Sequence, residues 1–257
     1  MTMFSENGEI IWDIDLTPGV DEEWAFMILN IEGSRLYLLG SNNHIDSHTY
    51  LLPVNENGDI GESWDLGREI YTYASANDGE ELIFYIKNDE GQLLKKYRSD
   101  GELVFQVERP MKRDWLECKQ IYIDEMNDIY LFASEGGDYV SHIYVTKYSE
   151  FGDYKWSHII AGRDYEVIEF VEAQYRGSGE FYVSGVLDPH GWSEGTKTVL
   201  LGMDSDGNRQ WIHYYHPENA ESIKPLATTL DENGDLFVAG TYSIEEEEID
   251  NVGGCGC

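Results

Sequence analysis

The sequence predicts an all-β fold, a single β-propeller in which five sheets of four antiparallel strands form a ring. Three observations lead to this prediction. Aromatic residues and glycine are abundant, with 18 Tyr, 9 Phe, 7 Trp and 26 Gly among 257 residues, as is typical of strands and tight turns. Two kinds of hairpin recur along the chain at a regular period. The two ends of the chain carry complementary halves of one repeat.

The first hairpin is a strand, a short polar cluster ending in glycine, and a second strand. The clusters are "SENG", "NENG", "RSDG", "SEFG" and "DSDG", and their glycines are Gly8, Gly58, Gly101, Gly152 and Gly207. A large aromatic follows four residues after the glycine in four copies and six residues after it in the copy with Trp64; the four are Trp12, Phe105, Trp156 and Trp211. The glycines are 50, 43, 51 and 55 residues apart, a period typical of propellers and repeat arrays.

The second hairpin lies between copies of the first, and "TTLDENGDLFVAGTY" (228–242) is its clearest copy. Asn-Gly pairs such as Asn233-Gly234 are strong hairpin signals, since both residues tolerate positive φ. Each period therefore holds two hairpins, or four strands, which is the content of one propeller blade. For one period the strands are expected at 117–123, 128–133, 141–148 and 154–161.

The ends of the chain predict how the ring closes. Residues 2–14 form a first-type hairpin with no second-type hairpin before it, and residues 222–242 form a second-type hairpin with none of the first type after it. Joined together they make a fifth four-stranded blade, which would remove the exposed sheet edges at both ends. The expected domain is 1–243, followed by a flexible acidic tail at 244–257.

The two hairpins resemble SBBP-type and PQQ-like β-propeller repeats. The match is carried by "TKYSEFGDYKW" and "LDENGDLFVAGT" and extends over most of the chain as a repeat consensus. The resemblance implies a propeller fold, but it implies neither an activity nor a quinone cofactor, because one fold hosts many functions.

Charge excludes some classes of partner. Fifty Asp and Glu oppose 17 Lys and Arg, for a formal net charge of −33. Nucleic acids and anionic membrane surfaces are therefore unfavourable partners, whereas a basic protein or peptide would be attracted. The simplest reading of the excess is a solvated acidic surface. A monomer is expected.

Location and thiol chemistry follow from three cysteines and from the first residues. The chain has no apolar run long enough for a bilayer, and its N-terminus lacks the pattern of a secretory signal, so a cytoplasmic protein is expected. Cys118 reads as a small buried hydrophobe. The tail ends in Cys255 and Cys257, which are either incidental thiols or sites of soft-metal binding, redox pairing or lipid attachment.

Binding residues are expected on the loops that connect the second strand of a blade to the third and one blade to the next, since these loops meet on one face of the ring. The candidates that could hold a ligand or partner are Arg113, Trp115, Arg163, His190 and Trp192. Arginine can hold an anionic group, and an exposed aromatic can stack on a sugar or a partner side chain. Internal salt bridges and packing over the neighbouring blade are the structural alternatives.

Two metal hypotheses remain as alternatives to purely structural roles. His44, Asp46 and His48 alternate along "HIDSH", so an extended strand would aim all three to one side for Zn²⁺; the parallel between His48 and His142, both in "SH-x-Y", favours a structural position. "DSDG" and "DENGD" resemble the start of a calcium loop, but they lack the later glycine and glutamate of an EF-hand. No resident cofactor is expected.

No catalytic motif is present, and no nucleophile, phosphate loop or zinc-protease pattern can be assembled from the sequence. The sequence therefore favours a non-enzymatic binding or scaffold module that holds a protein or peptide on its loop face. The alternative is an enzyme acting on a carbohydrate or another small substrate at the mouth of the channel.

Overall fold

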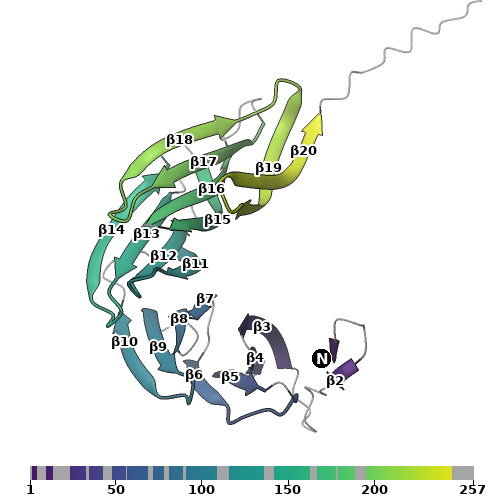
Figure 1. Cartoon of the computed structure of the whole chain (residues 1–257), viewed down its shortest axis with the longest axis vertical. Coiled ribbons are helices and arrows are strands. Elements are labelled where there is room, and N and C mark those ends of the chain that lie inside the picture. The colour runs from purple at the N-terminus through teal and green to yellow at the C-terminus, as the bar shows by residue number, and fades with distance from the viewer. Residues whose placement is uncertain are drawn as a thin grey trace, which may run out of the picture. The chain divides into compact units, whose positions relative to one another are not determined.

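The computed structural model describes the strands of the chain and most of its tight turns (Figure 1). The described residues are 2–4, 10–13, 24–32, 35–42, 48–55, 57–68, 72–77, 81–88, 91–108, 116–135, 142–162, 167–177, 179–188 and 195–244. Every regular element in these ranges is a β-strand, which confirms the all-β prediction.

Four sheets contain four antiparallel strands each, and in each of them the strands lie side by side in chain order. The first sheet holds β3 (Trp24–Glu32), β4 (Arg35–Asn42), β5 (His48–Val54) and β6 (Trp64–Arg68). The second holds β7 (Thr72–Asn77), β8 (Glu81–Asn88), β9 (Gly91–Arg98) and β10 (Leu103–Glu108). The third holds β11 (Leu116–Ile123), β12 (Ile129–Glu135), β13 (Ile143–Tyr148) and β14 (Tyr154–Ala161). The fourth holds β15 (Val167–Gly177), β16 (Glu180–Asp188), β17 (Lys197–Met203) and β18 (Arg209–Tyr215).

The prediction of four strands per period is confirmed. The strands expected at 117–123, 128–133, 141–148 and 154–161 correspond to β11, β12, β13 and β14 within two residues at each end. At the chain ends, β1 (Thr2–Phe4) pairs with β2 (Ile10–Asp13), and β19 (Ala220–Leu230) pairs with β20 (Leu236–Ile244). These two pairs are separate two-stranded sheets in the described part of the chain, so the union of the two ends stays a prediction.

The chain divides into two compact units, residues 1–133 with 146–157 and residues 134–145 with 158–257. The boundaries fall within β12, β13 and β14. Ile244, the first residue of the expected acidic tail, is the last residue of β20, and residues 245–257, including Cys255 and Cys257, lie outside the described residues.

The repeated polar clusters form one kind of turn. In each turn the N–H of the first residue donates to the carbonyl of the fifth, and the N–H of the fourth donates to the carbonyl of the first. The fourth residue has positive φ, which costs glycine little; it is Gly58, Gly101, Gly152, Gly207, Gly234 or, in one turn, Asn127 with φ of 61°. These six turns begin at Asn55, Arg98, Asp124, Ser149, Asp204 and Asp231.

Apolar side chains between successive sheets of the first unit make its core. One cluster joins the first and second sheets and contains Leu51, Leu66, Leu82, Phe84, Ile86 and Tyr97, with Trp64 against it. Another joins the second and third sheets and contains Ile83, Tyr85, Leu94, Cys118, Ile121, Ile129, Leu131 and Tyr148, with Phe105 and Val107 against it. Cys118 is buried in this cluster, as the sequence predicted.

The aromatic residue of the repeat packs on a turn of the next sheet. A Cβ on Gly101 would lie 2.6 Å from Nε1 of Trp64, and a Cβ on Gly152 would lie 2.9 Å from Cδ2 of Phe105. In both cases the aromatic after one turn glycine covers the turn glycine of the following sheet. The aromatic after the turn glycine therefore packs one sheet on the next, whether it follows the glycine by four residues, as Phe105 does, or by six, as Trp64 does.

Candidate functional site

The predicted loop face cannot be built from the described residues. Arg113, Trp115, Arg163, His190 and Trp192 all lie outside them, as do His44 and Asp46. The structure therefore neither brings these side chains together nor separates them, and their roles stay predictions.

His48 is the one member of the proposed zinc site that the structure describes. Its Nδ1 lies 2.8 Å from Oδ2 of Asp65 on the neighbouring strand β6, and its ring stacks on Tyr50 with centroids 6.1 Å apart. His142, its counterpart in "SH-x-Y", also contacts the tyrosine two residues on, but edge to face, with its ring centroid 6.0 Å from that of Tyr144. Within the described ranges, no three His, Cys, Asp or Glu side chains gather as a metal-binding group.

The acidic turns proposed for calcium direct their first carboxylate at their own backbone. Oδ1 of Asp204 accepts the N–H groups of Asp206 and Asn208, and Oδ1 of Asp231 accepts those of Asn233 and Asp235. The backbone hydrogen bond from Asp235 is the largest influence on the pKa of Asp231, which is lowered. Such bonds stabilise the ionised carboxylate and fix the turn.

A cluster of buried charges holds together the two turns of the third sheet. Asp128, at the end of the turn between β11 and β12, binds Lys147 of β13, with Nζ 2.8 Å from Oδ2, and also binds Lys155 of β14. Asp124 lies 3.6 Å from Lys147 and accepts a hydrogen bond from Tyr130. Burial works to raise the pKa of Asp128, but the hydrogen bonds and positive charges of the two lysines outweigh it and lower that pKa.

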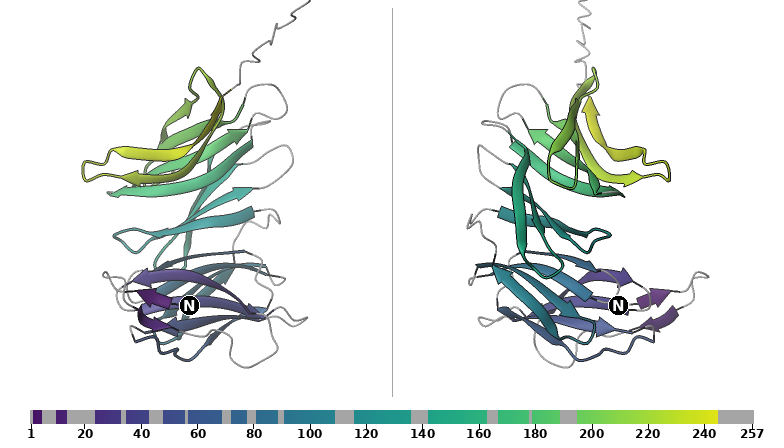
Figure 2. Two further views of the ribbon diagram at one scale, coloured as in Figure 1. Left: turned by 90° about the vertical axis from the view of Figure 1, so that its right-hand side faces the viewer. Right: turned by 60° about the vertical axis from the view of Figure 1, so that its left-hand side comes forward.

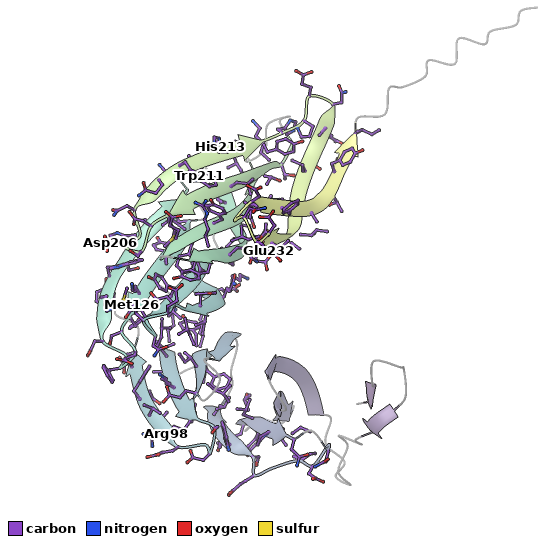
Figure 3. The ribbon with its side chains drawn as sticks, in the orientation of Figure 1. Arg98, Met126, Asp206, Trp211, His213 and Glu232 are labelled. Atoms are coloured by element: carbon purple, nitrogen blue, oxygen red, sulfur yellow. The ribbon has the colours of Figure 1, made fainter. Side chains whose placement is uncertain are left out.

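Two apolar side chains lie on the turns that this cluster of charges connects. Met126 is 77% exposed at the turn between β11 and β12, and Phe151 is 71% exposed at the turn between β13 and β14. Figure 3 labels Met126 on its turn. Because the sheet is an antiparallel meander, both turns lie at the same end of it. Neither residue was among the predicted site residues; the signal in the sequence is an apolar residue at a turn position that is polar in other copies.

The second unit carries a partly exposed aromatic row on its fourth sheet (Figure 3). Tyr182, Gly202 and Trp211 are opposite one another on β16, β17 and β18. The glycine leaves room for the Trp211 ring, whose centroid lies 5.4 Å from those of Tyr182 and His213. Trp211 occupies the repeat position of Trp64 and Phe105, which are covered by the turn of a following sheet.

In the last hairpin, the apolar side chains of strand β20 are more exposed than those of the equivalent strand β12. Figure 2 shows its two strands side by side, and β19 is held to β15 by Glu172, whose Oε2 accepts hydrogen bonds from the Thr228 N–H and hydroxyl. On β20, however, Phe237 is 56% exposed, Tyr242 69% and Ile244 59%. In the equivalent strand β12, the run from Ile129 to Ala133 is completely buried.

Comparison with known proteins identifies the class of fold. No family model and no curated protein sequence matches the chain. Among solved structures, the chain is similar to an ulvan lyase of polysaccharide lyase family PL25 bound to -[GlcA(1-4)Rha3S]-, with a TM-score of 0.54 and 11% identity over 85% of this chain. That alignment covers 62% of the lyase, so the chain spans less than two thirds of its length.

Two other similar structures are a neuraminidase-like protein and an arabinofuranosidase. A subtype N11 neuraminidase-like protein of A/flat-faced bat/Peru/033/2010 aligns with a TM-score of 0.47 and 14% identity, over 82% of this chain and 56% of the other. An α-L-arabinofuranosidase from Clostridium thermocellum aligns with a TM-score of 0.41 and 11% identity, over 86% and 94%. At these identities the likeness establishes the fold alone: the chain has a propeller-type all-β fold built of four-stranded antiparallel sheets.

One further finding concerns membranes. The described residues contain no helix that could cross a bilayer.

Proposed function

We propose that the chain is a closed five-bladed β-propeller that acts on a carbohydrate at the mouth of its channel. This is the alternative that the sequence analysis set beside a non-enzymatic scaffold. The observation that carries it is the similarity to an ulvan lyase whose structure holds a bound saccharide. The SBBP-type or PQQ-like character of the repeat is part of the same proposal.

The exposed apolar side chains of the last hairpin support closure of the ring. The apolar side chains of β20 are exposed, whereas those of the equivalent strand β12 are buried. The hairpin of β1 and β2 has the strands of the missing half-blade, and its sequence contains the turn glycine Gly8. By the rule that Trp64 and Phe105 follow, this hairpin is the segment that would cover Trp211. Burying such apolar surface stabilises by about 25 cal/mol per Å².

Charge narrows the class of saccharide. The ulvan lyase binds a polymer of glucuronate and sulfated rhamnose, whereas this chain has a formal charge of −33. An anionic polymer would be repelled by that field. We therefore propose a neutral or cationic saccharide, with Trp115 or Trp192 of the predicted loops as a stacking residue, because aromatic faces suit the apolar face of a sugar ring.

A panel of defined oligosaccharides tests the proposal. Neutral cellohexaose and xylohexaose, cationic chitosan hexamer and an anionic ulvan oligosaccharide are titrated against the full chain by calorimetry, and new reducing ends are measured in parallel. We expect binding and turnover with a neutral or cationic member, none with ulvan, and loss of both in Trp115→Ala or Trp192→Ala. Tyr214→Ala, on strand β18, serves as the control. Absence of binding to every member overturns the proposal.

A second candidate function is the binding of a basic polypeptide, which the sequence analysis favoured. It is supported by a specific observation, the apolar pair Met126 and Phe151 on an acidic molecule.

A further inference from the structure

The repeat offers an internal comparison at the third position of its turn. Six turns share the same backbone hydrogen bonds, so the geometry makes the same demands on each. In four of them the third residue is polar: Asn57, Asp100, Asp206 or Asn233. In the two turns of the third sheet it is Met126 or Phe151. The turn itself therefore does not require an apolar residue there.

Neither side chain contributes to the core that the structure describes. Met126 is 77% exposed and Phe151 is 71% exposed, and neither belongs to the apolar clusters between the sheets. Exposed apolar residues at turn tips cost solvation without stabilising the fold, since polar residues serve these turns equally well. The comparison of the six turns therefore indicates that Met126 and Phe151 have a role other than stabilising the fold.

Ion pairs and hydrogen bonds hold the turns that carry the two side chains. The turn that carries Met126 ends at Asp128, which binds Lys147 and Lys155 from the strands that flank the turn of Phe151. Oδ1 of Asp124 accepts a hydrogen bond from the N–H of Met126, and Oγ of Ser149 accepts one from the N–H of Phe151. Turns held in this way lose little backbone freedom when a partner binds.

Acidic side chains surround the pair. Glu125 and Glu150 precede Met126 and Phe151 in their turns, and Asp153 follows Phe151. The neighbouring turn of the second sheet, which Phe105 brings close by packing on Gly152, adds Asp100, while its Glu102 is paired with Arg98. Lys147 and Lys155 are already engaged by Asp128 beneath the tips.

We propose that Met126 and Phe151 form a docking surface for a basic polypeptide segment that carries apolar side chains. The apolar pair supplies the contact area at the centre, and the acidic rim selects lysine- or arginine-rich sequences by charge complementarity. This surface lies at the turn end of the third sheet. The saccharide proposal concerns the loops at the opposite ends of the strands, so either proposal can fail without the other.

Two synthetic peptides test the surface. One alternates Lys and Leu over 13 residues, and the other has the same lysines with Ser in place of Leu. Fluorescence anisotropy measures their binding to the full chain in buffer at moderate and at high salt. The variant is Met126→Ser with Phe151→Ser, which keeps both backbone N–H donors. Ile159→Ser is the matched control, because Ile159 is 51% exposed on β14 of the same sheet and away from the turns. Thermal unfolding verifies that all three proteins are folded.

We expect the Lys-Leu peptide to bind at least about tenfold more tightly than the Lys-Ser peptide. The double variant should bring the two affinities within about twofold, and Ile159→Ser should leave the difference unchanged. High salt should weaken both peptides, because the rim acts through charge. Equal affinity of the two peptides for the unaltered chain, or a Lys-Leu preference that survives in the double variant, overturns the proposal.

Discussion

The ring of Phe105 covers Gly152, so that a methyl group on this glycine would lie 2.9 Å from Cδ2 of the ring. Phe105 belongs to the second sheet and Gly152 to the turn between β13 and β14 of the third. Trp64 covers Gly101 in the same way between the first and second sheets. In the second sheet, the turn glycine and the aromatic four residues after it therefore contact both neighbouring sheets, Gly101 the first and Phe105 the third.

Replacement of Gly152 by alanine should be costly for two reasons. The residue has φ of 84°, which costs an L-residue about 1–2 kcal/mol, and its Cβ would displace Phe105, which adds about 1–3 kcal/mol. Gly177→Ala is the matched control, because Gly177 has φ of 96° but no atom within 4 Å of an added Cβ. Urea unfolding should show a larger loss for Gly152→Ala than for Gly177→Ala. Equal losses would mean that the contact with Phe105 contributes nothing.

The ion pair of Lys147 and Asp128 should be strongly coupled. Lys147→Met leaves Asp128 and Asp124 buried with one cation fewer, and breaking a buried pair on one side costs about 3 kcal/mol or more. Adding Asp128→Asn should restore part of the loss, because the uncompensated carboxylate is gone. A double-mutant cycle on free energies of unfolding measures the coupling. Additive effects of the two substitutions would contradict the account.

Acid should weaken the fold partly through Asp128. Its pKa is lowered in the folded state, below an unfolded value of about 3.9. Its contribution to stability is therefore fully present above that unfolded pKa and is lost as the pH falls through the folded pKa. Asp128→Asn should be less stable at neutral pH and should lose less stability than the unaltered chain on further acidification below about pH 4. Parallel stability curves for the two proteins would show that Asp128 does not titrate with unfolding.

The number and placement of strands could be predicted because the repeat marks them at residue level. The polar turns need a particular backbone, with Gly152 or Asn127 at positive φ, and they allowed β11 to β14 to be predicted within two residues. The contact of Phe105 with Gly152 could not be predicted, because the spacing of two residues within a repeat does not say that they meet across different sheets. Met126 and Phe151 were not predicted as binding residues. An apolar residue at a turn position becomes noticeable only when the six turns of the same backbone geometry are compared.

The residues of the proposed loop site were predicted on other grounds. Trp115 and Trp192 were selected for residue type and for their expected position between strands, and both lie outside the described residues. His48 shows the limit of such selection: a strand pattern that suits a metal also suits a pair with Asp65 on the adjacent strand. Pattern alone does not distinguish the two.

Amide hydrogen exchange on β20 tests the closed ring most directly. The measurement compares residues 236–244 in the full chain with the same residues in a chain that lacks residues 1–13. If β1 and β2 complete the last blade, the outer-edge amides of β20 are protected in the full chain and exchange much faster after the deletion, while those of β12 keep their protection in both. Rapid exchange along β20 in both proteins would contradict closure by the N-terminal hairpin.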